Sequence, residues 1–160
     1  MKLLYITILS LLILSGCAGE DPNEHTTDSG IESSSNSTDD NSEDALEEEV
    51  NEALEGLSLN DGSKWKVDQS TDEGMKSIRE KVENFDGEDA EQLGKDIKSV
   101  LKDITKDCSM TGEDHNQYHI LLDAMMKESK QLKKGKSTDP SKMERYLDAY
   151  DTYFEVGELE

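Results

Sequence analysis

Residues 91–104 read EQLGKDIKSVLKDI, the clearest helical pattern in the chain. The apolar side chains of this stretch recur three and four residues apart and therefore share one face of a helix. They are Leu93, Ile97, Val100, Leu101 and Ile104. Gly94 is a mild internal weakness, because glycine has a low helix propensity. The pattern predicts an amphipathic helix from about Glu88 to Asp107.

Three further segments show the same periodicity. One helix is expected to begin at Ser70, which is followed by Glu73 in a capping-box pattern, and to end at Asp86-Gly87. Another is expected from about Thr111 to Gly135, and a last one from the Asp139-Pro140 cap onward. Short connections favour antiparallel neighbours, so the fold class is all-α, a small up-and-down bundle of about four helices. The helical-bundle domain is assigned to residues 59–160.

The segment that leads into the bundle has two parts. Residues 45–58 place Leu46, Val50 and Leu54 on one stripe, which predicts a short amphipathic helix. Asn60-Asp61-Gly62 then separates Leu59 from Trp65-Lys66-Val67. An Asp-Gly pair between short apolar runs favours a hairpin, although an irregular arm fits the same residues.

The N-terminus has the organisation of an export signal. Lys2 precedes an apolar run from Leu3 to Leu14, which is too short to span a bilayer. The tetrad Leu14-Ser15-Gly16-Cys17 resembles the lipobox of bacterial lipoproteins. That resemblance implies that residues 1–16 are removed and that Cys17 is lipidated, which anchors the protein to a membrane. The alternative is an ordinary secretory signal with an incidental cysteine.

Residues 17–44 are expected to be a disordered acidic tether. The stretch from Ser33 to Asp44 has no apolar side chain to offset the entropy cost of ordering, and Ala18 to Ser63 contains no Lys or Arg. The whole chain carries a formal net charge of -21, which makes nucleic acids and anionic lipids poor partners. The expected location is the cell envelope, and Ala18 after the anchored cysteine favours the outer membrane.

The candidate chemistry lies between the second and third helices of the bundle, in CSMTGEDHNQYH (residues 108–119). His115 and His119 are one helical turn apart, and Cys108 and Met110 precede them in the turn. Thiolate, thioether and imidazole form a soft ligand set, which suits copper(I) better than zinc, magnesium or calcium. We therefore expect Cys108, Met110, His115 and His119 to bind copper(I), and Met75 of the first bundle helix is a possible further sulfur ligand.

Other interpretations of these residues remain open. Histidines at helical spacing often pack in a half-buried position, Met125 and Met126 suit a core, and Cys108 is small enough to be buried. Against this, Met110 sits in a polar turn with no obvious core role, and a spare thiol in an oxidising compartment is a liability unless it is buried or liganded. Haem binding ranks below copper, because Cys-x-x-Cys-His is absent.

The chain carries no recognisable enzymatic motif. Gly-x-Ser-x-Gly, a phosphate-binding loop, a dinucleotide fingerprint and His-Glu-x-x-His are all missing from the sequence. We therefore expect a protein that is not an enzyme.

Residues Leu59 to Glu155 together resemble a family of small helical-bundle proteins and lipoproteins of bacterial envelopes. The resemblance rests on the Trp65 arm, the Cys-x-Met-x-Gly-x-x-His-x-x-x-His segment and the aromatic ending from Tyr150 to Phe154. The residues that recur in that pattern match Cys108, Met110, Gly112, His115 and His119 here. The resemblance implies a helical bundle with a metal or interaction site, and it supplies no catalytic residue.

Two functions follow from these observations. The first is a membrane-anchored envelope protein whose bundle binds copper(I). The second is a structural or interaction lipoprotein without a metal site, which docks another envelope protein. The second predicts that Cys108, His115 and His119 are buried or scattered, and that an aromatic patch around Tyr146, Tyr150 and Phe154 is exposed.

Overall fold

The computed structural model of the chain describes residues 40–158. The expected signal peptide, the expected lipidation site Cys17 and most of the expected tether lie outside the described residues. Within residues 40–158, no helix combines the length and the apolar character that a membrane span requires.

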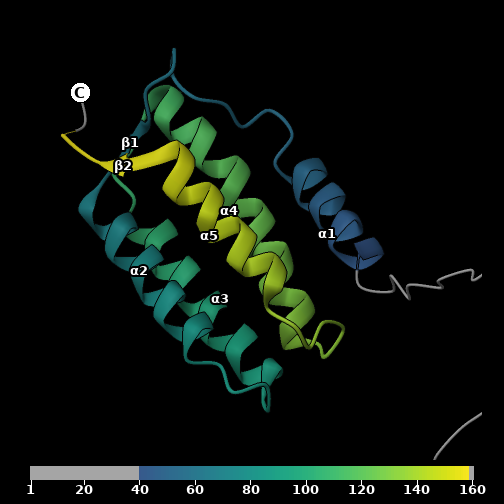
Figure 1. The fold of residues 1–160 in the computed structure, drawn as a ribbon. Coiled ribbons are helices and arrows are strands. Elements are labelled where there is room, and N and C mark those ends of the chain that lie inside the picture. The colour runs from purple at the N-terminus through teal and green to yellow at the C-terminus, as the bar shows by residue number, and fades with distance from the viewer. Residues whose placement is uncertain (1–39, 159–160) are drawn as a thin grey trace, which may run out of the picture. The chain divides into compact units, whose positions relative to one another are not determined.

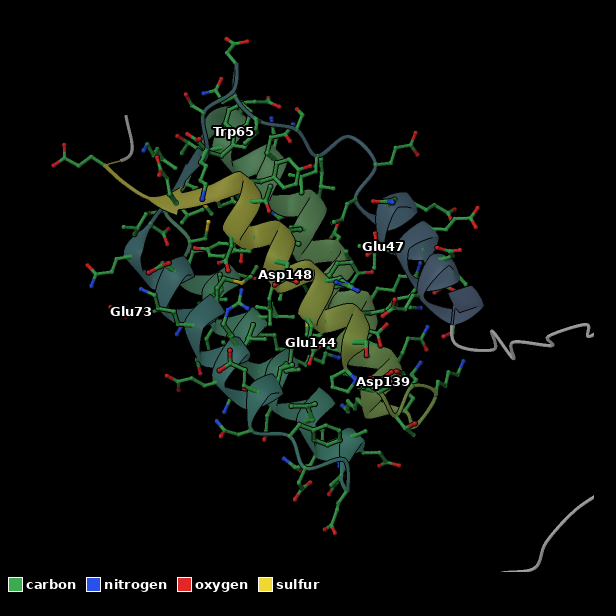
Figure 2. The ribbon with its side chains drawn as sticks, in the orientation of Figure 1. Glu47, Trp65, Glu73, Asp139, Glu144 and Asp148 are labelled. Carbon is green, nitrogen blue, oxygen red and sulfur yellow. The ribbon has the colours of Figure 1, made fainter. Side chains whose placement is uncertain are left out.

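The described part is an all-α bundle, as the sequence predicts. Its four main helices are α2 (Gln69–Glu83), α3 (Ala90–Asp107), α4 (Gly112–Lys133) and α5 (Ser141–Tyr153). α4 packs against α3 and α5, and α2 packs against the same two helices (Figure 1). Charged side chains such as Glu73, Glu144 and Asp148 lie on the outer surfaces (Figure 2).

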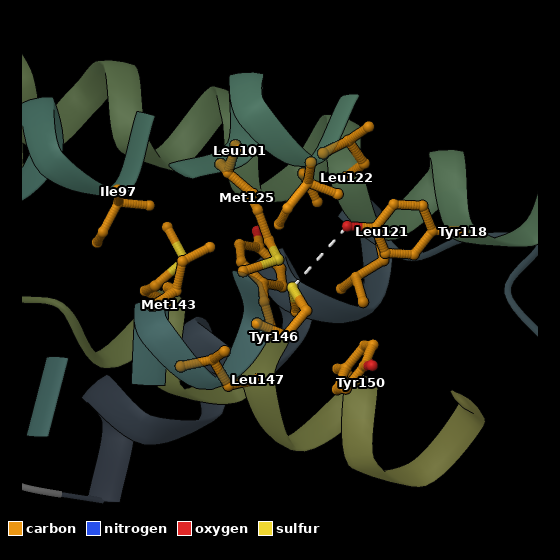
Figure 3. Close-up of a cluster of buried hydrophobic side chains, with 14 of the residues drawn as sticks. Ile97, Leu101, Tyr118, Leu121, Leu122, Met125, Met143, Tyr146, Leu147 and Tyr150 are labelled. Carbon is orange, nitrogen blue, oxygen red and sulfur yellow. Dashed lines mark hydrogen bonds between the residues drawn. The ribbon is translucent and has the colours of Figure 1, made fainter. Parts of the chain in front are cut away.

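The core lies where the four helices meet, and α3, α4 and α5 supply most of the side chains in Figure 3. Leu101 of α3, Met125 of α4 and Met143 of α5 are each fully buried. Gly94 lies where α3 crosses α4, and a Cβ atom there would stand 2.4 Å from the backbone nitrogen of Lys133. Gly94 is therefore a packing requirement of the fold as well as a local weakness in its helix.

The first bundle helix is capped two residues earlier than expected. The N-cap of α2 is Asp68, whose Oδ1 atom accepts hydrogen bonds from the backbone N–H of Thr71 and the hydroxyl of Ser70, both at 2.8 Å. The assignment of Ser70 as the cap is wrong, because the Asp68 carboxylate accepts the bonds of the first turn. Asp89 caps α3 in the same way, through the N–H of Gln92 at 2.8 Å.

The Asp-Gly pair forms a tight turn, but the expected hairpin does not extend from it. Asn60 and Ser63 exchange two backbone hydrogen bonds of 2.9 Å, with positive φ at Asp61 and Gly62. The strand that follows, β1 (Trp65–Val67), instead pairs in parallel with β2 (Phe154–Val156) after the last helix. The reason is that α5 returns the C-terminal segment to this end of the bundle (Figure 1), where Phe154 is buried.

The helix before the bundle, α1 (Asp40–Ala53), begins and ends about five residues earlier than the predicted 45–58. Residues 40–44, which we assigned to the tether, therefore belong to a helix. Acidic residues near a helix N-terminus are stabilised by the helix dipole, which allows the helix to extend beyond its apolar stripe. Val50 is buried against the bundle, and Glu49 and Glu47 form ion pairs with Lys142 and Arg145 of α5.

Candidate functional site

The short connection between α3 and α4 brings a thiol and an imidazole together. Cys108 is the C-cap of α3, and His115 lies in the first turn of α4. The Sγ atom of Cys108 is 3.7 Å from Nδ1 of His115. The ring of His119 packs edge-on against His115, with ring centroids 4.3 Å apart. All three side chains are half-buried, so a small ligand can reach them from solvent.

The two methionines of the predicted ligand set are core residues. Met110 is 4% exposed and packs in the hydrophobic core, so the interpretation that it lacks a core role is wrong. The polar sequence around Met110 hid its burial, because the loop turns this side chain inward. Met75 is 1% exposed, and its Sδ atom lies 3.9 Å from the hydroxyl of Tyr118. Met110 and Met75 are therefore part of the hydrophobic core, against which Cys108 packs.

Asp68 fixes the loop that carries Cys108. Its second carboxylate oxygen, Oδ2, accepts hydrogen bonds from the backbone N–H of Ser109 at 2.7 Å and from the Ser109 hydroxyl at 3.0 Å. Burial raises the pKa of Asp68, but the hydrogen bonds from Ser109, Thr71 and Ser70 outweigh it and lower the pKa to about 2. The charged carboxylate thus joins the start of α2 to the end of α3.

Two side chains of α4 attach the other half of the site to the segment around β1. Oδ1 of Asp114 accepts the backbone N–H of Lys66 at 3.0 Å, and Oε1 of Gln117 accepts the N–H of Ser58 at 3.0 Å. These bonds hold the first turn of α4, and with it His115, against the segment that contains Ser58 and β1. Sequence analysis missed Asp68, Asp114 and Gln117, although Asp68 followed by Ser70 and Thr71 is a recognisable cap pattern.

Burial shields this end of the bundle from water. Desolvation raises the pKa of the Tyr118 hydroxyl, and the neighbouring charges of Cys108 and Asp68 raise it further. Tyr118 therefore stays protonated and packs edge-on against Phe154, with ring centroids 5.8 Å apart. Tyr118 therefore contributes a neutral hydroxyl to this end of the bundle, beside the charged carboxylate of Asp68.

The donor atoms suit a soft ion of low coordination number. Within residues 40–158, no group of three or more His, Cys, Asp or Glu side chains is placed to hold one ion, so a four-coordinate zinc site of these residues is not formed. What the geometry offers is one thiol and one imidazole at chelating distance, with a second imidazole beside them. In the described part of the chain, Cys108 forms no disulfide.

The aromatic docking patch of the alternative function is not present. Tyr146, Tyr150 and Phe154 are 4%, 5% and 2% exposed, so the expectation that they form an exposed patch is wrong. The helical spacing of these residues could not show whether their face is buried or exposed, because that depends on the contacts of α5 with α1, α2 and α4. Among the described residues, the exposed large apolar side chains are Leu59 and Val156.

A comparison with protein-family models, curated proteins and solved structures finds no match to this chain.

Proposed function

We propose that this protein binds one copper(I) ion through Sγ of Cys108 and Nδ1 of His115. The observation that supports this proposal is the 3.7 Å separation of these two atoms in a half-buried position. Metal bonds of roughly 2.3 Å to sulfur and 2.0 Å to nitrogen span that separation with an angle of about 120° at the ion. A trigonal arrangement of this kind fits copper(I) and leaves one position for a third ligand.

The third ligand is proposed to be His119 or Met110. The His119 ring already touches His115, and a rotation of the His119 side chain would bring a nitrogen toward the ion. Met110 is two residues from Cys108 along the chain, and its buried thioether would have to leave the core packing to reach the ion. Thioether and thiolate ligands select copper(I), whereas zinc favours four nitrogen, oxygen and thiolate ligands. The charge of the ion would be met by the Cys108 thiolate.

The proposed setting is the cell envelope, with Cys17 lipidated. The lipobox residues support this setting, and the protein would then hold copper(I) on a tether at a membrane surface. The proposed role is to buffer, transfer or sense the ion, without catalysis.

The test is an anaerobic copper(I) titration against a competing chelator. The protein is the chain from residue 17 with Cys17→Ser, so that Cys108 is its one thiol. We expect one ion per chain, with affinity reduced at least a hundredfold in Cys108→Ser and at least tenfold in His115→Asn. His25 is the histidine that lies outside the proposed site, so His25→Asn is the matched control and should leave the affinity unchanged.

Two further variants identify the third ligand. Met110→Leu preserves apolar volume and removes the sulfur, and His119→Asn removes the second imidazole. Whichever variant lowers the affinity names the ligand. If Cys108→Ser binds copper(I) as tightly as the parent chain, the proposed metal site is refuted.

A further inference from the structure

Lysines gather on one side of the bundle in an otherwise strongly acidic chain. The chain has 38 Asp and Glu residues against 17 Lys and Arg, yet residues 127–136 contain five lysines and one carboxylate. That carboxylate, Glu128, is 5% exposed, whereas the five lysines are all exposed. The neighbouring helix α3 carries four further lysines. The solvent-facing charge of this part of the molecule is therefore positive.

The crossing of α3 and α4 brings lysines of the two helices together. At Gly94 the helices approach so closely that an added Cβ atom would stand 2.4 Å from the backbone nitrogen of Lys133. Lys98 lies one turn after Gly94 on the same side of α3, and Lys130 lies one turn before Lys133 and Lys134 on α4. Lys98 is half-buried, and the others are exposed. The name lysine patch is used below for Lys98, Lys102, Lys130, Lys133 and Lys134.

The ammonium groups of the lysine patch have no carboxylate partner within residues 40–158. The basic residues that form ion pairs in this range are Lys66, Lys76, Arg79, Lys142 and Arg145. Desolvation lowers the pKa of Lys98, and the charges of the other four lysines of the patch lower it further. Holding like charges together costs free energy, so a partner with negative charge would relieve the repulsion.

The helix dipole explains part of this arrangement. Lys130 and Lys133 lie in the last turn of α4, where the helix C-terminus stabilises a positive charge. Lys98 and Lys102 lie in the interior of α3, where the dipole gives no such stabilisation. The meeting of lysines from two helices therefore needs another explanation.

We propose that the lysine patch docks the bundle on a lipid surface that contains anionic phospholipids, through the phosphate groups of their headgroups. Ammonium groups bind phosphate as point charges, and clustered lysines on a helix surface are typical of proteins that recognise anionic headgroups. The proposal goes beyond copper binding, and it rests on the proposed envelope setting for the presence of a lipid surface.

The choice of lysine favours lipid phosphate over an acidic protein segment. Both arginines of the chain, Arg79 and Arg145, pair with carboxylates, whereas the patch contains no arginine. A guanidinium group has a rigid fork that matches a carboxylate in a fixed position. An ammonium group on its flexible stem can follow headgroups that move in a fluid surface.

The net charge of the chain opposes this docking mainly at long range. Exposed charges are screened over about 8 Å at physiological ionic strength, and a helix with its side chains is roughly 10–12 Å across. Carboxylates on the outer surfaces of α2 and α5, such as Glu73 and Asp148 (Figure 2), are thus screened when α3 and α4 face the lipid. Asp96 and Asp103 of α3 lie on the stripe of Val100, which faces α2.

The test is sedimentation with vesicles at physiological ionic strength, without copper. The protein is the chain from residue 17 with Cys17→Ser, so no lipid anchor contributes and the outcome does not depend on lipidation. We expect binding to vesicles of equal parts phosphatidylglycerol and phosphatidylcholine, and none to phosphatidylcholine alone. The triple variant Lys98→Gln, Lys130→Gln, Lys133→Gln should bind roughly a hundredfold more weakly, because each lysine at an anionic surface strengthens partitioning about fivefold.

A matched triple variant separates the patch from the total charge. Lys64→Gln, Lys76→Gln, Lys81→Gln removes the same charge before β1 and on α2, and its binding should stay within roughly twofold of the parent chain. Circular dichroism verifies that each variant is folded. The exposed pair Lys102→Gln, Lys134→Gln tests the patch without altering the half-buried Lys98, and it should also weaken binding.

Three results would overturn the proposal. The first is equal weakening in both triple variants, or no binding of the parent chain to phosphatidylglycerol vesicles. The second is release from the vesicles by inorganic phosphate at the concentration of the lipid phosphate, which would indicate a site for the free ion. The third is binding of poly-L-glutamate through the patch without vesicle binding, which would assign the patch to an acidic protein segment.

Discussion

The replacement Gly94→Ala should destabilise this protein, although alanine is the better helix former. A Cβ atom at position 94 would stand 2.4 Å from the backbone nitrogen of Lys133 and 2.8 Å from the carbonyl oxygen of Ser129. Ordinary contacts begin near 3.4 Å, so α3 and α4 must separate by about 1 Å at their crossing. Backbone atoms cannot rotate aside as a flexible side chain could.

Two opposing effects set the magnitude. Alanine gains about 1 kcal/mol over glycine in a helix interior. Forcing extra volume into a packed interface costs roughly 1–3 kcal/mol, and contacts with backbone belong at the upper end of this range. We therefore expect a net loss of about 1–2 kcal/mol, equivalent to a melting temperature lower by roughly 4–8 °C for a domain of this size.

The assay is urea denaturation followed by helical circular dichroism and by the fluorescence of Trp65, the single tryptophan of the chain. Ser99 gives the matched control, because it is exposed on α3 and its side chain is free of the α4 crossing. At position 99 alanine should be more stable than glycine by about 1 kcal/mol. At position 94 the order should be reversed. If alanine is the more stable residue at both positions, the close packing inferred at Gly94 is refuted.

Two other variants test the core and the loop that carries the site. Met125→Ala, at a fully buried position, should lower the free energy of unfolding by about 2–5 kcal/mol, and the half-buried neighbour Met126→Ala should lose less; urea denaturation measures both. Asp68→Asn should lose about 1 kcal/mol at pH 7, because the pKa of Asp68 is lowered from 3.8 to about 2 in the folded protein and solvent screening reduces the corresponding stabilisation. A lowered folded-state pKa adds stability above about pH 4 that disappears as the pH falls through about 2, so the parent chain and Asp68→Asn should converge in stability in acid. A constant difference from pH 7 to pH 2 would contradict the role of the charge.

The local part of the candidate site was accessible to sequence reasoning. Cys108 and His115 lie on either side of a short loop that ends one helix and starts the next, so their proximity follows from chain connectivity. His115 and His119 are neighbours for the same reason, because they are one turn apart on α4. Asp68 could not be connected to Ser109 in this way, since 41 residues separate them along the chain.

The direction of Met110 was equally hidden from the sequence. A methionine between Ser109 and Thr111 looks like a surface residue, and only the packing of the loop across the bundle buries it. Three aromatic residues of α5 and β2 gave the same error. Tyr146, Tyr150 and Phe154 suggested an exposed patch, but α5 is surrounded by other helices and buries them.

The sequence by itself determined the helical class, the approximate helix limits and the turn at Asp61-Gly62. These features depend on side-chain periodicity, caps and backbone preferences, which act within about one helical turn. The tertiary structure alone decided the parallel pairing of β1 with β2, the close crossing at Gly94 and the burial of Glu128. Each of these joins segments distant in the chain, and such contacts are set by how the helices pack together rather than by any local pattern.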